Sequence, residues 1–399
     1  MCYNLYQYFS MKRSTQSMNN PFKGIFSKVA GVSGGSDSSI AVGVDIGSSA
    51  IKVVEIRKKS GRIVLETYGA IALGPYTSLS PGATTNLPVD KAVEALKEVL
   101  KQSGASSTEI ALAIPVQQSL IFNLELPAQI KEEEIATIVP TEARRYIPVP
   151  ITEVSIDYFI FPKKELSFEE ANELRAEGGE QTQNALQEKT NVLVVATQND
   201  AAARYRSILS AGNFSASFFE IEVFSAIRAN FEHELSPVML MDFGASRTKV
   251  SIVEFGMLKS FHSIERGGAD ITESIAKSLS IPFSEAEKMK KEFGLLGNPA
   301  DKNLADTIEL HTDYIFAEAN NVLLNYEKKH SRIISKVIFT GGGALLKGLT
   351  EVAVGNFRAE ISMGHPFNKV GAPAFLAKVL ETVGPEFAVA LGLALRKLQ

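Results

Sequence analysis

The sequence carries one short pattern in two distant places, and this repeat constrains the fold more than any other feature. Each copy, at residues 40–56 and 238–253, is an apolar strand ending in Asp-x-Gly, followed by small polar residues and a second, β-branched strand. Two strands joined by so short a turn predict a β-hairpin. A single Asp-x-Gly turn is most often an ordinary tight hairpin. Two turns of the same composition indicate a shared chemical purpose.

Each turn has the residue types that a phosphate site requires. A glycine lets the main chain approach a phosphate closely, since it has no Cβ. Successive N–H groups form a concave anion site, and hydroxyl side chains add donors. An aspartate repels phosphate, so the two aspartates are predicted to hold the water shell of Mg²⁺ instead. The phosphate-binding candidates are Gly47, Ser48, Ser49, Lys52, Gly244, Ala245, Ser246 and Thr248, and the metal candidates are Asp45 and Asp242, both through water.

The cationic residues beside the turns have a corresponding prediction. Lys52 is expected to pair with phosphate as a point charge, the alternative being a lysine at a strand edge. Arg247 and Lys249 could do the same from the second turn. Two turns that face each other would then clamp a polyphosphate and its metal from both sides.

A third glycine-rich segment follows near the C-terminal end. Residues 336–349 read as a buried strand, three glycines and the start of a helix. A flexible turn is the simple explanation, but glycines directly after an apolar strand more often allow the close approach of a ligand. The segment lacks the Gly-Lys-Ser/Thr of a P-loop, and no GxGxxG is present, which argues against a nicotinamide or flavin enzyme.

Composition excludes several other classes. The 41 basic and 45 acidic residues give a net charge of −4, without the basic excess of a nucleic-acid binder. The single cysteine, Cys2, cannot form an internal disulfide, and the five histidines show no paired spacing for zinc. No apolar run approaches the ~18 residues of a membrane span. The short apolar run Ala388–Leu395 predicts a buried helix instead. We therefore expect a cytoplasmic protein.

Two polar segments are expected to lie outside the main fold. Pro21–Ala30 could form a short amphipathic helix that contacts a membrane or partner, but a frayed tail is the preferred interpretation, followed by a Gly/Ser linker at 31–39. Lys163–Thr190 lies between two strand-like runs and is predicted to be a mobile hairpin loop, more readily a solvated insertion than a partner-binding segment.

Taken in order, these segments resemble the actin-like ATPase superfamily, which includes actin, sugar kinases, the large heat-shock chaperones, MreB and FtsA. Residues 45–52 and 242–244 resemble its two phosphate motifs, and 340–344 its adenosine motif. Gly267–Asp270 is similar to its GG-x-D turn, and Ala286–Lys290 to its AExxK helix. The resemblance covers 40–399 and implies an α/β, two-lobed actin-like fold with RNase H-like sheets. The implied adenosine-binding residues are Gly267, Gly268, Asp270, Glu287, Lys290, Gly341, Gly342 and Gly343.

Within that superfamily the chain is similar to the PilM family, an FtsA-like branch of type IV pilus assembly proteins. The stretches that carry this likeness are 43–56, 141–160 and 192–212. The branch has a relocated small subdomain, for which we expect a strand at 119–126, a helix at 131–146, strands at 154–161 and 191–197, and a helix at 200–211. The 163–190 insertion and the extension before Ile40 depart from the family pattern.

The resemblance also implies a division of the chain into subdomains. The expected parts are an N-terminal extension at 1–39, subdomain 1A at 40–117, subdomain 1C at 118–214 with its insertion at 163–190, the rest of 1A with a connecting helix at 215–235, subdomain 2A at 236–266, subdomain 2B at 267–330, the rest of 2A at 331–375, and a C-terminal helix returning to 1A at 376–399.

Hydrolysis in such a fold needs a water positioned in line with the terminal phosphate. Residues 219–226 resemble the x-E-P-x-A connecting motif, with Val223 in place of proline. Glu222 and Asp242 are therefore the catalytic candidates, although Glu222 could simply be a carboxylate favoured at a helix start. We expect at most a slow Mg²⁺-dependent ATPase.

The leading hypothesis is an ATP-binding adaptor at the cytoplasmic face of the inner membrane. The resemblance implies that it binds the N-terminal peptide of a PilN-like inner-membrane protein. Pilus motor or platform proteins and a second copy of the chain are further expected partners. The alternatives are an FtsA-like ATP-dependent filament and a kinase or phosphatase of the same fold. The chain ends within the apparent fold, which counts against an FtsA-type membrane helix.

Overall fold

The computed structural model describes residues 39–127, 129–161, 189–232, 234–298 and 303–398. The frayed tail and nearly all of the Gly/Ser linker predicted before Ile40 lie outside these ranges, as does nearly all of the 163–190 insertion. The chain separates into two compact units. One contains Gln117–Ala201, and the other contains Gly31–Val116 together with Ala202–Gln399.

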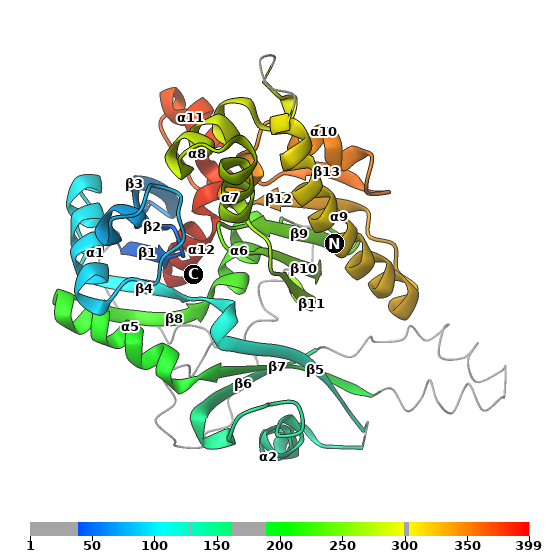
Figure 1. The fold of residues 1–399 in the computed structure, drawn as a ribbon. Helices are drawn as coiled ribbons and strands as arrows, with labels where there is room; N and C mark the ends of the chain where they lie inside the picture. The colour runs from blue at the N-terminus through cyan, green and yellow to red at the C-terminus, as the bar shows by residue number, and fades with distance from the viewer. Residues whose placement is uncertain (1–38, 128, 162–188, 233, 299–302, 399) are drawn as a thin grey trace. The chain divides into compact units, whose positions relative to one another are not determined.

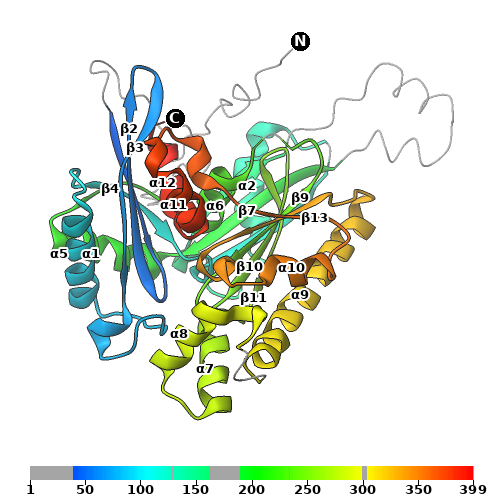
Figure 2. The same ribbon diagram turned by 90° about the horizontal axis from the view of Figure 1, so that it is seen from above.

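The larger unit contains two five-stranded sheets with the same topology (Figures 1 and 2). In each sheet three consecutive strands form an antiparallel meander, and two later strands add in parallel beside the first strand. The first sheet has the order β3-β2-β1-β4-β8, with β1 Ile40–Ile46, β2 Ala50–Lys59, β3 Arg62–Ala72, β4 Glu109–Ile114 and β8 Ser215–Ile221. The second has the order β11-β10-β9-β12-β13, with β9 Val238–Phe243, β10 Thr248–Glu254, β11 Met257–Ile264, β12 Lys336–Thr340 and β13 Glu360–Met363.

This repeated mixed sheet confirms the predicted actin-like class with two RNase H-like sheets. Both Asp-x-Gly segments form hairpins, as predicted. In the first, β1 pairs with β2 so that Asp45 lies opposite Lys52. In the second, β9 pairs with β10 so that Asp242 lies opposite Lys249. The duplicated sequence pattern is therefore a duplicated hairpin at the start of each sheet.

Helices cover the sheets and bury their apolar faces. Those of the larger unit are α1 Val89–Ser103, α5 Asn199–Gly212 from Ala202 onward, α6 Glu222–Asn230, α7 Gly268–Leu279, α8 Phe283–Phe293, α9 Asn303–His330, α10 Leu349–Val354, α11 Ala377–Val383 and α12 Ala388–Leu398. Helix α9 packs Phe316 and Leu323 onto the second sheet. No helix in the described ranges combines the length and apolar character needed to cross a membrane.

Helix α12, predicted as a buried helix from its apolar run, packs tightly against β1 and α6 (Figure 1). Two glycines make this approach possible. A Cβ at Gly43 would overlap the carbonyl oxygen of Ala390, and a Cβ at Gly392 would overlap that of Ser225. A buried ion network reinforces the contact, because Arg396 of α12 donates to the Glu220 carboxylate at 2.8 Å and Arg228 of α6 donates to it at 2.6 and 2.8 Å.

The smaller unit is a three-stranded antiparallel sheet with one described helix. Its strands, in the order β5-β7-β6, are β5 Ser119–Leu126, β6 Val154–Ile160 and β7 Thr190–Gln198, and its helix is α2 Glu132–Ala143. Ile135 and Val139 of α2 are buried against apolar residues of β5 and β7. The expected strands and helices of this region are present, although α2 ends three residues before the predicted end.

Candidate functional site

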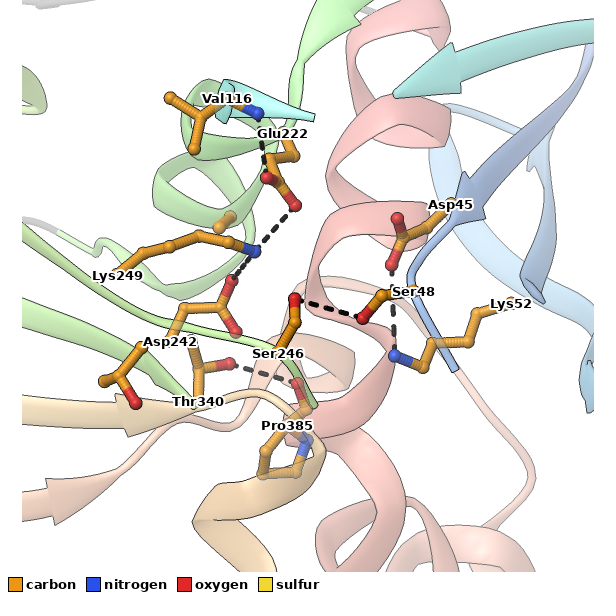
Figure 3. Close-up of polar contacts among 12 residues, drawn as sticks. Asp45, Ser48, Lys52, Val116, Glu222, Asp242, Ser246, Lys249, Thr340 and Pro385 are labelled. Carbon is orange, nitrogen blue, oxygen red and sulfur yellow. Dashed lines mark hydrogen bonds and ion pairs between the residues drawn. The ribbon is translucent and has the colours of Figure 1, made fainter. Parts of the chain in front are cut away.

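The two hairpin turns lie against each other. Gly47 N donates to Ala50 O at 3.0 Å, and Gly244 N donates to Arg247 O at 2.9 Å, so each turn is closed by its own main chain. The Ser48 hydroxyl donates to the Ser246 hydroxyl at 3.2 Å, which joins the turns directly (Figure 3). Residues that are far apart in the chain therefore bring two hydroxyl groups together, while the Gly47 and Gly244 amides close their own turns.

Beside these turns, Lys249 lies between two carboxylates. Its ammonium group donates to Glu222 Oε2 at 2.7 Å and to Asp242 Oδ2 at 3.1 Å (Figure 3). Glu222 is the first residue of α6, and its Oε1 accepts a hydrogen bond from Val116 N at 2.9 Å. The two carboxylates predicted to act on water are thus connected through one lysine.

Lys249 remains charged in this position. Burial by itself would lower the pKa of its ammonium group, but the carboxylates of Asp242 and Glu222 outweigh burial and raise it. The Lys249 side chain is only 11% exposed, so both of its ionic contacts are largely shielded from water.

Asp45 differs from Lys249, because its surroundings disfavour its charged form. It lies at the end of β1 and is nearly buried, and burial raises the pKa of its carboxyl from 3.8 to about 6. Lys52 opposes this rise, but its ammonium is 3.9 Å from Asp45 Oδ2, at the outer limit of an ion pair. The negative charges of Glu222 and Asp242 add to the rise. Lys52 and Lys249 together only partly offset the burial that raises the pKa of Asp45.

The triple-glycine turn packs against the second Asp-x-Gly turn. Gly341, with φ = +85°, lies so close to Asp242 that a Cβ would overlap its carboxylate, and Gly343 lies against Phe243. Gly341 N donates to Pro385 O at 2.9 Å, and the Thr340 hydroxyl donates to the same oxygen at 3.1 Å. The glycines thus serve close packing around Asp242; Gly342 lies beside the Glu386 side chain.

The Gly267–Gly268 turn is hydrogen-bonded to the second Asp-x-Gly turn. Gly268 N donates to Gly244 O at 3.0 Å, and a Cβ at Gly267 would overlap the carbonyl oxygen of Ala245. Asp270 caps α7 by accepting from Gly267 N at 2.8 Å. The start of α7 is therefore fixed beside the second phosphate-motif turn.

Glu287 and Lys290 lie on α8, next to this helix start. Glu287 Oε2 is 2.7 Å from Lys290 Nζ and accepts from the Thr272 hydroxyl at 2.6 Å, while Lys290 also donates to Gly268 O at 2.7 Å. Burial would raise the pKa of Glu287, but Lys290 outweighs it and the pKa is lowered. Gly82 approaches the Glu287 carboxylate so closely that a Cβ there would overlap it.

The predicted site residues do not all present free polar groups to this region. Thr248 is buried and donates its hydroxyl to Arg266 O at 2.9 Å, so its donor is already used in this structure. Arg247 forms an ion pair with Glu265. Gly47, Ser48, Ser246, Asp45, Asp242, Glu222 and Gly341 are brought together; Glu287 and Lys290 form a neighbouring cluster linked through Gly268.

Three contributors were not identified from the sequence. Val116 supplies a main-chain donor to Glu222, and Gly82 covers Glu287. Tyr205 of α5 is buried, and the charges of Glu222 and Asp45 add to the burial that raises the pKa of its phenol. None of the three lies in a recognisable motif, because each depends on contacts between segments distant in the chain.

The donor set suits a metal held together with phosphate and water. Among the residues that the structure describes, no group of three or more His, Cys, Asp or Glu side chains could hold a metal ion by itself. Mg²⁺ keeps several waters and usually takes only one or two carboxylates with substrate phosphates. Asp45 and Asp242 fit that role, since each ends the first strand of its hairpin.

Comparisons with known proteins agree with this fold. A family model described as "Type IV pilus assembly protein PilM" matches residues 43–398. The cell division protein FtsA of Staphylococcus epidermidis is 24% identical over 345 residues, covering 78% of this chain and 71% of that protein.

Two solved structures are similar over most of the chain. The PilM-PilN type IV pilus biogenesis complex gives a TM-score of 0.73 at 23% identity, covering 90% of this chain and 98% of that one. The ethanolamine utilization protein EutJ of Carboxydothermus hydrogenoformans gives 0.51 at 15% identity, covering 90% and 89%. At these identities the structural likeness establishes the fold.

Proposed function

The chain belongs to the family of type IV pilus assembly protein PilM, and from this premise we propose that it is a cytoplasmic ATP-binding adaptor of the pilus assembly machinery. Its place is the cytoplasmic face of the inner membrane, which it reaches through partner proteins. The observation that carries the nucleotide part is the direct contact of the two Asp-x-Gly turns through Ser48 and Ser246.

ATP fits the groups that meet at these turns. Hydroxyl and main-chain N–H donors of the turns suit phosphate oxygens, and Lys52 adds a positive charge beside the first turn. Bound Mg²⁺ would neutralise phosphate charge, with Asp45 and Asp242 holding its water shell. The second cluster, Glu287 and Lys290, is assigned to the adenosine end.

This assignment predicts that Asp45→Ala and Asp242→Ala each weaken binding of a non-hydrolysable ATP analogue with Mg²⁺, by roughly tenfold or more. Isothermal titration calorimetry measures the affinity. Asp313→Ala, an exposed carboxylate on α9, is the matched control and keeps the wild-type affinity. Unchanged affinity in both site variants would refute the nucleotide site.

The adaptor part concerns an extended peptide from a PilN-like inner-membrane protein. Its support is the family membership, together with a similar solved structure that is a PilM-PilN complex. Extended peptides bind through main-chain hydrogen bonds at sheet edges and through side-chain pockets. In the smaller unit, β5 and β6 are the edge strands.

A direct test uses synthetic peptides that copy the cytoplasmic N-termini of membrane proteins encoded beside this chain. Fluorescence anisotropy with the purified full chain, with and without ATP and Mg²⁺, measures binding. We expect one peptide to bind and its scrambled version not to bind. If none binds, the adaptor assignment fails while the nucleotide site stands.

The FtsA-like alternative is favoured by one observation, the 24% identity to FtsA. It predicts ATP-dependent polymers, which sedimentation and electron microscopy would detect. An adaptor shows none under the same conditions.

A further inference from the structure

The ammonium group of Lys249 lies between two carboxylates, a position that would otherwise attract a metal ion. Its Nζ contacts one oxygen of Glu222 and one of Asp242, at 2.7 and 3.1 Å (Figure 3). The two carboxylates come from different elements, α6 and β9, and the lysine from a third, β10. The ammonium is therefore the link between the first residue of α6 and the second sheet.

Each carboxylate also has a close neighbour other than the lysine. Glu222 keeps its orientation through Val116 N, which donates to its second oxygen at 2.9 Å. Asp242 Oδ1 lies so near the main chain of Gly341 that a Cβ there would overlap it, which limits movement of the carboxylate on that side. Their side chains are only 9% and 13% exposed. Two carboxylates held in place and shielded from water repel each other strongly unless a cation lies between them.

An ammonium group and a divalent ion satisfy such a pair in different ways. The ammonium carries one charge and three donors on a tether that belongs to the protein. A divalent ion carries two charges and must first lose part of its water shell. While the tethered cation is in place, a second cation gains little by approaching the same two oxygens.

We propose that Lys249 is a built-in counter-ion that closes the Glu222–Asp242 pair to divalent cations in the free protein. Metal then enters with the nucleotide, through the water shell assigned to Asp45 and Asp242, and Glu222 stays bound to the lysine. In this state Glu222 is not free to orient water, so we expect bound nucleotide to be turned over slowly. The consequence for turnover rests on the proposed nucleotide site, but the closure to metal does not.

The test uses the full chain without nucleotide and Mn²⁺ as the probe. Electron paramagnetic resonance of free Mn²⁺ measures binding, and thermal unfolding with and without Mn²⁺ measures stabilisation. We expect Lys249→Met to bind Mn²⁺ at least tenfold more tightly than wild type and to gain a Mn²⁺-dependent rise in Tm. Lys249→Arg, which keeps the charge, remains like wild type. Lys277→Met, which removes an exposed ion-paired lysine on α7, is the control.

The double variant Lys249→Met/Glu222→Gln tests whether the added Mn²⁺ affinity comes from the Glu222–Asp242 pair. We expect this variant to lose the added Mn²⁺ affinity. If Lys249→Met folds poorly, Lys249→Gln supplies an uncharged side chain that can still donate hydrogen bonds to the carboxylates, and the same gain is expected. Unaltered Mn²⁺ affinity in both Lys249 variants, or a gain that persists in the double variant, overturns the proposal.

A second arm separates this inference from the proposed function. The affinity for a non-hydrolysable ATP analogue is measured with Mg²⁺ and with EDTA, and the ratio of the two is expected to rise at least tenfold in Lys249→Met. If no variant binds nucleotide at all, the proposed function fails and the Mn²⁺ result is judged alone. If nucleotide binds but neither the Mn²⁺ affinity nor the ratio changes, only the counter-ion proposal fails.

Discussion

At the scale of single residues, Asp45 links the site to the pH dependence of stability. Its pKa is raised to about 6 in the fold from 3.8, so the folded protein retains a proton that the unfolded chain releases between these values. The stabilisation from this proton is complete below pH 3.8 and is lost as the pH rises through 6. Above pH 6 the free protein folds with a buried charge that Lys52 compensates only weakly.

Asp45→Asn removes that charge without changing the size of the side chain. At pH 8 we expect the nucleotide-free variant to be more stable than wild type by up to about 3 kcal/mol, since the shift is about two pKa units. The advantage shrinks as the pH falls toward 4. Urea unfolding at pH 4, 6 and 8 gives the difference. An advantage that is the same at all three values would contradict a charge-based cause.

The sequence placed the candidate residues at their turns but did not predict their contacts. Asp45 and Asp242 could be placed at hairpin turns because the Asp-x-Gly pattern and the flanking strands are local signals. The bridge from Lys249 to Glu222 could not be predicted, since it depends on where α6 begins relative to β10. The same holds for Thr248, whose hydroxyl serves the main chain of Arg266.

At the scale of elements, the approach of α12 to β1 and α6 depends on two glycines. Gly392→Ala puts a methyl group into the main-chain oxygen of Ser225, and Gly43→Ala does the same at Ala390. Because a backbone atom cannot move aside as a side chain can, we expect each variant to lose about 3 kcal/mol of unfolding free energy. Chemical denaturation measures the loss.

Gly355→Ala is the matched control for these two variants. Gly355 follows α10 with ordinary helical angles, is exposed, and a Cβ there would meet only Val352 O at 3.6 Å. Its stability should stay within about 0.5 kcal/mol of wild type. A loss at Gly355 equal to that at Gly392 would show that the packing of α12 is not the cause.

Local sequence patterns predicted the positions of helices and strands well, but they predicted the ends of these elements less well. The apolar run at 388–395 correctly predicted a buried helix, and the expected strand at 119–126 matches β5. Helix α2 was predicted to reach Tyr146 but ends at Ala143, because the following amides of Arg145 and Tyr146 bond three residues back, to Glu142 and Ala143. Apolar periodicity does not predict such a change from four-residue to three-residue hydrogen bonds in the last turn of a helix.

At the scale of the whole molecule, the repeated sheet allows one ligand to act on both halves of the larger unit. Each sheet begins with an Asp-x-Gly hairpin, and the hydroxyls of Ser48 and Ser246 join the two turns. A triphosphate bound at both turns must separate these hydroxyls. Its binding energy then acts on the relative position of the two sheets, because a ligand shifts an equilibrium by its differential affinity for the two states.

A pair of cysteines allows the contact between Ser48 and Ser246 to be measured by the rate of disulfide formation. In a chain with Cys2 replaced by serine, Ser48→Cys and Ser246→Cys place two thiols where hydroxyl oxygens now lie 3.2 Å apart. We expect rapid disulfide formation under mild oxidation, seen by mass spectrometry, and at least tenfold slower formation when an ATP analogue and Mg²⁺ are bound. Each single-cysteine variant controls for links between molecules. An unchanged rate with saturating nucleotide would mean that the ligand does not lie between the two turns, and the coupling of nucleotide to the arrangement of the two sheets would be lost with it.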